Sequence, residues 1–507
     1  MGWVSGICAG WDAGELNRSA AASAAAWGGR LLQGILYALL FAGCVAACAN
    51  LRSQRARQTI LLGASYVLYL SWGPWFALVL LASTVANFFL GRWLRSNPAG
   101  GILATGIFVN LALLSSFKYL PAAAVQFPAS ALQPFAHLAM PLGISFWTFQ
   151  AMSYLFDLYR GEELDPSFTE FALYMVFFPV AISGPICRMP DMLPQFRSAE
   201  TTRWGEIERG TRRIATGIFM VQLAKLLGQG ILGGDGISSG FDRVTRWSGP
   251  DVWCLAFGYG LQLFLDFAGY SHIAIGAARA MGFTVPENFA RPFESTSPSI
   301  FWTRWHMSLS FWIRDYVFLP LATMRREIWW RNLALVISMA AFGVWHGATV
   351  LFLVWGVYHG VLLMLHRVLQ QRQRRWNWEP GRMGTALGWI ATMTLVNLGW
   401  IFFRANSQAE AVQMLKALVS PGSYQEHFLS ASLYILVGSI AVGYALAIRT
   451  IDAVESQGDQ TESGIVALVA RWRWYWLPPL YGLAMVFLLI VTLTGGATAA
   501  QFMYNKF

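Results

Sequence analysis

Two histidines, each directly after a tryptophan, are the residues of this chain best suited to chemistry. His306 lies in FWTRWHMSLSFWIRDY (301–316), and His346 lies in the apolar segment ISMAAFGVWHGATVLFLVWG (337–356), which contains no other ionisable side chain. A polar group in apolar surroundings costs free energy unless it is hydrogen-bonded or used in function. Because imidazole exchanges protons near neutral pH, we predict that His346 acts as a general base on a hydroxyl group.

The residues beside His346 support this prediction. Trp345 precedes the histidine and Gly347 follows it, and a glycine at a helix break would let a substrate approach the ring closely. The alternative is a histidine that only bonds to a backbone carbonyl of a neighbouring helix. Metal-ligand partners three or four positions away are absent around both histidines, so we expect no metal site.

The segment around His306 carries further candidates for a donor or acceptor tunnel. They are Arg304, Trp305, Ser310, Arg314 and Asp315. In a helix, Ser310 and Arg314 would follow His306 at one-turn intervals on the same face. Neighbouring helical residues do not face each other, so Arg314 and Asp315 are expected to find partners elsewhere. An arginine could bind a phosphate or stabilise an oxyanion, whereas the alternative is an interfacial segment anchored by tryptophan and arginine.

Two more candidates lie in the apolar run 263–283, where Asp266 and Tyr270 are one helical turn apart. The carboxylate could pair with an arginine of the His306 segment. The alternative is a buried ion pair with a structural role only.

These residues must be positioned by membrane helices. The chain has 507 residues, of which 56% are hydrophobic and only 12% are charged, while soluble domains average about 25% charged residues. Many apolar runs are long enough to cross about 30 Å of hydrocarbon. We therefore predict an all-α polytopic membrane protein with about 11–13 transmembrane helices in one compact bundle with a central cavity.

The predicted elements follow the apolar runs. We expect membrane segments near 31–49, 59–90 (broken at 71–75), 102–117, 137–157, 168–186, 214–232, 251–267, 332–348, 350–366, 384–403, 430–448 and 475–494. Prolines and charges between 282 and 330 predict a re-entrant or half-buried segment, because irregular backbone at membrane depth must be covered by protein. Residues 1–30 are predicted to be a flexible or interfacial segment, 450–470 a polar loop, and 31–507 a single membrane domain.

The net charge of +10 is concentrated in arginine clusters. The first is Arg52, Arg55 and Arg57, the second is Arg197, Arg203, Arg209, Arg212 and Arg213, and the third is Arg367, Arg372, Arg374, Arg375 and Arg382. Cytoplasmic loops collect such residues, so we place all three clusters in the cytosol and expect no nucleic acid partner. A phosphorylated or acidic cytosolic donor is a more plausible partner. The five cysteines show no zinc-ligand spacing and imply no disulfide framework.

Several segments resemble the membrane-bound O-acyltransferase (MBOAT) family, most of all its bacterial alginate O-acetyltransferase branch, with the D-alanyl-lipoteichoic-acid transferase branch more distant. They run in order from about 140 to 407: MPLGISFWTFQAMSYLFDLYRG (140–161), FFPVAISGPICRM (177–189), DFAGYSHIAIGAARAMGFTVPENFARPF (266–293), FWTRWHMSLSFWIRDYVFLPL (301–321), VWHGATVLFLVWGVYHGVLL (344–363) and GWIFFRANS (399–407).

The resemblance implies a helical bundle with a funnel through the membrane. It implies that His346, in the Trp-His-Gly position, is the main active-site histidine, and that His306, in the Arg-Trp-His position, accompanies it. It also implies a cytosolic acyl donor, an acceptor on the outer side, and a periplasmic partner protein of the SGNH type.

The leading hypothesis is an O-acetyltransferase of the cell inner membrane that contacts membrane lipids and carries no permanently bound cofactor. It would use acetyl-CoA as donor and esterify an exported polysaccharide such as alginate or cellulose, directly or through the periplasmic partner. A second hypothesis keeps the class but takes an acyl or aminoacyl group from a carrier protein. Two hypotheses without covalent chemistry are a transporter or flippase, and a scaffold for polysaccharide secretion.

Overall fold

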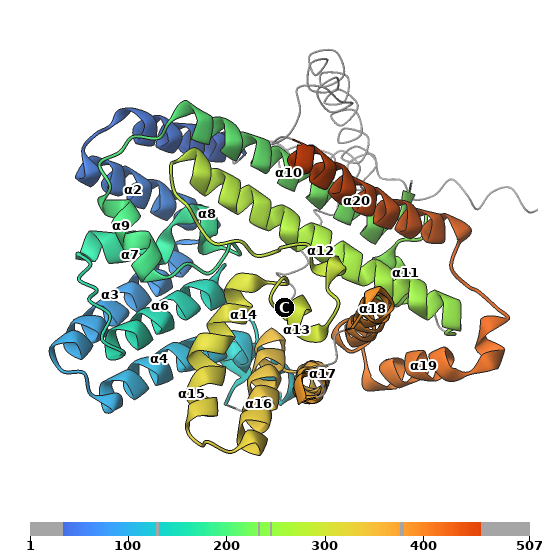
Figure 1. The fold of residues 1–507 in the computed structure, drawn as a ribbon. Coiled ribbons are helices and arrows are strands. Elements are labelled where there is room, and N and C mark those ends of the chain that lie inside the picture. The colour runs from blue at the N-terminus through green and yellow to red at the C-terminus, as the bar shows by residue number, and fades with distance from the viewer. Residues whose placement is uncertain (1–33, 128–130, 232–233, 244–245, 376–379, 458–507) are drawn as a thin grey trace, which may run out of the picture.

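The computed structural model describes residues 34–457 except 128–130, 232–233, 244–245 and 376–379 (Figure 1). The predictions for 1–30, for residues 458–470 of the predicted polar loop and for the span near 475–494 lie outside the described residues. The prediction of a loop was wrong for residues 450–457, because the helix that begins at Ala431 continues to Gln457. The predicted all-α polytopic class is confirmed. Seven of the described helices are long and apolar enough to cross a membrane: Pro74–Ser96, Gly100–Lys118, Gly249–Ala280, Ile328–His346, Val350–Arg375, Arg382–Arg404 and Ala431–Thr450. Other predicted runs form helices that are shorter, such as Gly34–Asn50, or that are long but less apolar, such as Trp204–Gln229.

The N-terminal part of the molecule is a layer of helices that follows the helix Gly34–Asn50. Its elements are α2 (Gln54–Trp72), α3 (Pro74–Ser96), α4 (Gly100–Lys118), α5 (Leu120–Gln126), η1 (Gln133–Phe135), α6 (Ile144–Tyr159), α7 (Phe168–Val176), α8 (Phe178–Ala181) and α9 (Met189–Arg197). The predicted break at 71–75 is present, because α2 ends at Trp72 and α3 begins with a proline, which suits the first turn of a helix.

The centre of the molecule is a pair of long helices, α10 (Trp204–Gln229) and α12 (Gly249–Ala280), with the short α11 (Ile237–Arg243) before α12. The 32 residues of α12 span about 48 Å at 1.5 Å per residue, which exceeds about 30 Å of hydrocarbon. In Figure 1, α10 and α12 run across the view while α17 and α18 are seen nearly end-on. Glycines allow close packing, since a Cβ on Gly217 would lie 2.4 Å from the carbonyl oxygen of Gly269.

The segment predicted to be re-entrant consists of short helical turns. They are η3 (Pro292–Glu294), α13 (Pro298–Trp302), α14 (Met307–Ile313), η4 (Arg314–Phe318) and α15 (Leu319–Thr323). An isolated antiparallel bridge joins Phe289 to Trp305. Phe301 and Asn288 are completely buried, so the irregular backbone is covered by protein, as its polar groups require.

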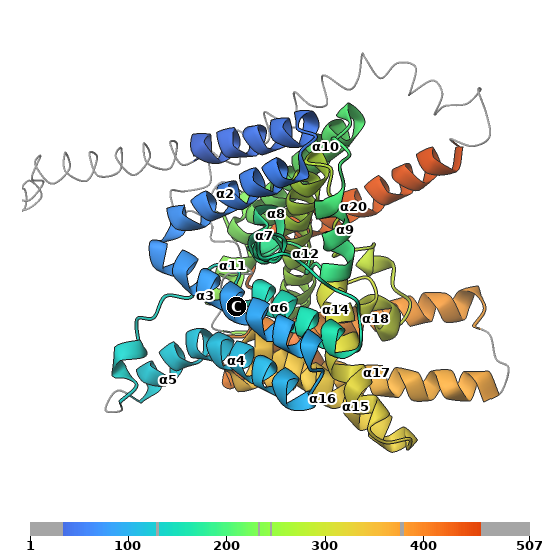
Figure 2. The ribbon, with the colours of Figure 1, turned by 90° about the vertical axis from the view of Figure 1, so that its left-hand side faces the viewer.

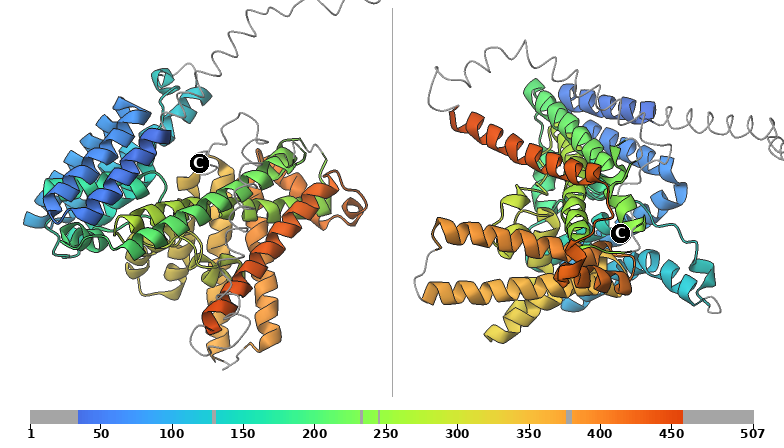
Figure 3. Two further views of the ribbon diagram at one scale, coloured as in Figure 1. Left: turned by 90° about the horizontal axis from the view of Figure 1, so that it is seen from above. Right: turned by 90° about the vertical axis from the view of Figure 1, so that its right-hand side faces the viewer.

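The C-terminal part consists of long helices and two short ones. They are α16 (Ile328–His346), α17 (Val350–Arg375), α18 (Arg382–Arg404), α19 (Gln408–Val419), η5 (Pro421–Tyr424) and α20 (Ala431–Gln457). Figure 2 shows α17 and α18 side by side, and both views of Figure 3 show them extending to the same side as α20. The hairpin of α16 and α17 packs backbone to backbone, because a Cβ on Gly343 would lie 2.2 Å from the carbonyl oxygen of Phe352.

The first two arginine clusters lie side by side. Arg57 donates hydrogen bonds to the carbonyl oxygens of Ser198 and Glu200, and the amide of Thr202 donates to the carbonyl of Cys48 at 3.0 Å. The third cluster is at the far ends of α17 and α18, away from His346 and Arg404.

Candidate active site

His346 is the last residue of α16, and only residues 347–349 separate it from α17. The side chain is 5% exposed. Its imidazole contacts the rings of Phe342, Trp355 and Phe403, with centroid distances of 4.9, 5.3 and 5.0 Å. A helix end inside an apolar region therefore fixes the ring among aromatic side chains.

His346 also borders a cavity of about 190 Å³. The lining includes Trp345, Ile182 and the residues 140–146 that lead into α6. The histidine is thus buried but lies against a space that a small group can enter. The role of Gly347 differs from the prediction, because a Cβ there would lie 2.4 Å from the ring of Phe352. This glycine makes room for a phenyl ring.

A cation that the sequence reasoning missed lies next to this histidine. Lys118 is the last residue of α4, and its ammonium group donates a hydrogen bond to the carbonyl oxygen of Trp345. The same ammonium lies 4.9 Å from the centroid of the Trp345 ring. In the sequence, Lys118 ends an uncharged apolar run and resembles an ordinary interfacial lysine; the fold brings it to the site from 227 residues away.

His306 is the N-cap residue of α14 and is 2% exposed. Its backbone has φ 43° and ψ 54°, the left-handed conformation. Among the described residues only Arg291 and His306 combine a side chain with such a positive φ. This conformation costs free energy for a residue with a Cβ and persists only where the surroundings enforce it. The ring packs edge-on against Phe267 of α12 at 4.5 Å.

A buried polar network holds the backbone around His306. The carbonyl of Asn288 accepts a hydrogen bond from the amide of Met307 at 2.9 Å, and its side chain accepts one from the hydroxyl of Ser308 at 2.6 Å. The side-chain amide of Asn288 donates to Ser271 of α12 at 3.0 Å. Asn288 is completely buried and was not among the predicted site residues, since an isolated asparagine after Pro286 and Glu287 carries no distinctive pattern.

The two histidines lie near one another. Trp302, which precedes His306 by one turn, contacts Phe342 at 5.5 Å and Trp355 at 5.9 Å. Both of these rings also contact His346. The segment of His306 and the end of α16 therefore pack against the same aromatic side chains.

The other residues predicted near His306 fall into different surroundings. Trp305 is 5% exposed and packs against Phe301 at 5.4 Å and Trp400 at 5.2 Å, as a core residue does. The hydroxyl of Ser310 donates to the carbonyl of Trp305 at 2.9 Å. Arg304 is partly buried, and its side chain lies 3.5 Å from the carbonyl oxygen of Arg291.

The prediction that Arg314 and Asp315 each find a partner elsewhere is confirmed for Asp315, which pairs with Arg188, and was wrong for Arg314, which pairs with Asp315 itself. The Nε of Arg314 lies 2.7 Å from a carboxylate oxygen of Asp315, and Arg188 binds the other oxygen at 2.7 Å. Both residues lie in the π-helical turn η4, whose wider spacing changes the side-chain directions assumed for an α-helix. Burial alone would raise the pKa of Asp315, but hydrogen bonds from the two arginines hold that pKa below its usual value.

Asp266 and Tyr270 lie on α12 one turn apart, as predicted. Asp266 is 6% exposed, and Phe267 beside it is the residue that contacts His306. These two side chains therefore belong to the helix that supports His306. Within the part of the chain that the structure describes, no group of three or more His, Cys, Asp or Glu residues could hold a metal ion.

Several known proteins are similar to this chain. The family model described as MBOAT, membrane-bound O-acyltransferase family, matches residues 89–404, a range that contains both histidines, Lys118 and Asn288. A protein of Pseudomonas aeruginosa named Probable alginate O-acetylase AlgI is 34% identical over 411 residues, covering 78% of this chain and 76% of the relative. The Peptidoglycan O-acetyltransferase of Helicobacter pylori is 31% identical over 393 residues, with 70% and 72% covered.

A more distant relative is the Teichoic acid D-alanyltransferase of Bacillus subtilis. It is 32% identical over 275 residues, which cover 52% of this chain and 68% of the relative.

Proposed function

Because this chain belongs to the membrane-bound O-acyltransferase family, we propose that it transfers an acetyl group from acetyl-CoA in the cytosol to hydroxyl groups of an exported polysaccharide. The chain is a multi-pass membrane acyltransferase, and the cell inner membrane is its proposed location. The family assignment leaves no support for a non-catalytic transporter or scaffold. The names of the alginate and peptidoglycan relatives support a polysaccharide acceptor.

The observation that carries this proposal is the placement of His346, a buried imidazole that borders a cavity at the end of a helix. A neutral imidazole takes the proton of an acceptor hydroxyl as its oxygen attacks the thioester carbonyl carbon. The carbon–sulfur bond then breaks, and the thiolate leaves with the proton from the imidazolium. The products are an ester and a free thiol, and the imidazole returns to its neutral form.

Lys118 and His306 are proposed to assist this step. The tetrahedral intermediate carries negative charge on the former carbonyl oxygen, and a fixed cation in an apolar site stabilises such charge strongly. Lys118 is held beside His346 by its bond to Trp345. His306, fixed by the Asn288 network, is proposed to orient a substrate or share the proton.

The direct test is transfer by the purified protein in lipid nanodiscs. Wild type, His346→Ala, His306→Ala and the matched control His427→Ala are supplied with radiolabelled acetyl-CoA and an oligosaccharide acceptor, and thiol release and ester formation are both measured. His427 lies between η5 and α20, outside the site. We expect loss of both signals in His346→Ala and wild-type values in the control. Retained transfer by folded His346→Ala protein contradicts the proposal.

A carrier-protein donor is a second candidate, favoured by the similarity to the D-alanyltransferase. The basic clusters that we assign to the cytosol suit an acidic carrier as well as CoA. Separate titrations distinguish the two donors. The rate of transfer is measured with loaded carrier protein and with acetyl-CoA, and the donor with the higher kcat/KM is the preferred one.

A periplasmic partner of the SGNH type is proposed to receive the acetyl group where transfer proceeds by relay. In that case the purified membrane protein alone releases thiol slowly. Addition of the partner then increases release and places the label on the partner's serine.

A further inference from the structure

A second cavity lies on the other side of the catalytic histidine. Its volume is about 580 Å³, within the range of about 300–1,000 Å³ that is typical of sites for small ligands. It is lined by the start of α17, the end of α18, the start of α19 and parts of α11 and α12.

Two phenyl rings separate this cavity from His346. Phe352 and Phe403 line the cavity, contact each other at 5.0 Å, and contact the imidazole at 6.2 and 5.0 Å. The wall is one aromatic layer thick, so displacement of a single ring would let a ligand group reach the histidine.

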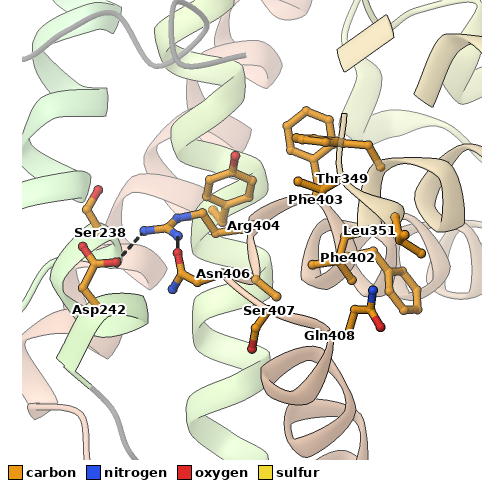
Figure 4. Close-up of a pocket in the computed structure, with 14 residues that line it drawn as sticks. Ser238, Asp242, Thr349, Leu351, Phe402, Phe403, Arg404, Asn406, Ser407 and Gln408 are labelled. Carbon is orange, nitrogen blue, oxygen red and sulfur yellow. Dashed lines mark hydrogen bonds and ion pairs between the residues drawn. The ribbon is translucent and has the colours of Figure 1, made fainter. Parts of the chain in front are cut away.

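The polar lining is electrically balanced. Figure 4 shows the guanidinium of Arg404 between Asp242 and Asn406. Arg404 binds the Asp242 carboxylate at 2.9 Å and the Asn406 side chain at 3.0 Å, and it lies 4.9 Å from the ring of Phe241. Among the described lining residues, these are the two charged ones, and they pair with each other. A ligand carboxylate would have to displace Asp242.

Neutral hydrogen-bonding groups supply the rest of the polar surface. Ser238 lines the cavity next to Asp242, and the exposed Gln408 lines it near Phe402 (Figure 4). The hydroxyl of Tyr259, on a completely buried side chain that also borders the cavity, has no hydrogen-bond partner within the described residues. A buried hydroxyl is usually satisfied, so this one is poised to bond with a ligand hydroxyl.

The location suits an acceptor from the outer side. The 23 residues of α18 cover about 34 Å, which is enough to cross about 30 Å of hydrocarbon. They run from the arginine-rich end assigned to the cytosol to the cavity at Arg404. We propose that this cavity binds the polysaccharide acceptor and that it selects neutral sugar units over uronic acids. This inference rests on the proposed polysaccharide acceptor. It adds the cavity in which the acceptor binds and the prediction that its sugar units are uncharged.

Binding without a donor tests the cavity separately from catalysis. The full-length protein in nanodiscs is titrated with a β-1,4-linked glucose tetramer and with a uronic acid tetramer, and Kd is measured by tryptophan fluorescence and calorimetry. Wild type is compared with Tyr259→Phe, with Asp242→Asn and with Tyr66→Phe, a control on α2 outside the cavity.

We expect wild type to bind the neutral tetramer more tightly than the uronic acid tetramer. Loss of one hydrogen bond in Tyr259→Phe should raise the Kd for the neutral tetramer by about threefold to tenfold, while Tyr66→Phe matches wild type. Asp242→Asn leaves Arg404 available, so the Kd for the uronic acid tetramer should fall.

Three results overturn the proposal: equal or tighter binding of the uronic acid tetramer by wild type, a Tyr259→Phe protein that binds like Tyr66→Phe, or an Asp242→Asn protein with unchanged preference. Failure of the proposed function would give a different result. Wild type would then consume no thioester in the transfer assay, while the Kd values for the two tetramers would still show whether the cavity binds them.

Discussion

Lys118 and Trp345 are joined by a hydrogen bond from the ammonium group of the lysine to the main-chain carbonyl of the tryptophan. The bond connects the end of α4 to the last turn of α16, so it links the N-terminal layer of helices to the hairpin that carries His346. The indole ring lies under the same ammonium at 4.9 Å. A single side chain thus supplies both a structural link and a positive charge beside the proposed base.

Removal of this charge should impair transfer more than folding. In Lys118→Met, which keeps most of the side-chain volume, we expect kcat for thiol release to fall by about a hundredfold to a thousandfold, the range for loss of one group that stabilises an oxyanion. Lys118→Arg should retain more activity because it keeps the charge. Lys225→Met on α10 is the matched control, and a wild-type kcat in folded Lys118→Met would exclude the proposed role.

The left-handed backbone of His306 predicts different effects for two substitutions that both remove the imidazole. Glycine tolerates this conformation and alanine does not, so His306→Gly should be more stable than His306→Ala by about 1 kcal/mol. Apparent melting temperatures in the same detergent measure the difference. Both variants should lose transfer to the same extent; equal melting temperatures would show that the backbone relaxes when the ring is removed.

Gly347 should tolerate a larger residue only if Phe352 becomes smaller. A Cβ at position 347 would lie 2.4 Å from the Phe352 ring, and such overpacking typically costs about 1–3 kcal/mol. We therefore expect Gly347→Ala to lower both the melting temperature and transfer, and Gly347→Ala/Phe352→Leu to recover part of the loss. The double-mutant cycle gives the coupling energy, and strict additivity of the two changes would argue against the contact.

Acid should weaken the link between α7 and α9. Hydrogen bonds from Arg197 to both carboxylate oxygens, at 2.7 and 2.9 Å, hold the pKa of Glu170 below its usual value. A lowered folded-state pKa means that the stabilisation is present above the unfolded pKa of about 4.3 and is lost as the pH falls through the folded value.

Melting curves between pH 7 and 3.5 test this linkage. Glu170→Gln should melt below wild type at pH 7, and the gap should close in acid. Glu208→Gln is the control, because its pair with Arg212 is exposed and such pairs contribute little. A gap that stays constant with pH would assign the loss to packing.

The helical class, the break at 71–75 and the irregular segment after residue 282 follow from local patterns: long apolar runs, Gly-Pro punctuation and charges without a clean span. His306 and His346 were candidates for the same reason, because an ionisable residue within an apolar segment can be recognised from the sequence alone. Asp315 shows where local reasoning failed, because its contact with Arg314 depends on a π-helical turn that the residue pattern does not indicate.

Residues supplied from a distance were not predictable in this way. Lys118 reaches the site from α4 and Asn288 from the loop after α12. Each is an ordinary residue in its own segment and gains its role from a backbone carbonyl or a hydroxyl contributed by another part of the chain. Trp305 is the opposite case: its position beside a histidine suggested function, and the structure places it in the core.

The glycine-mediated packing of α16 against α17 has a consequence for how such enzymes diversify. With Gly343 and Gly356 each in contact with the opposite backbone, the two helices of the hairpin have little room to shift, so the ring of the proposed base, His346, is held at a fixed position. Changes of donor or acceptor preference must then come from the facing surfaces, residues 140–146 on one side and the ends of α18 and α19 on the other. Evolution can remodel both surfaces without disturbing the reactive centre.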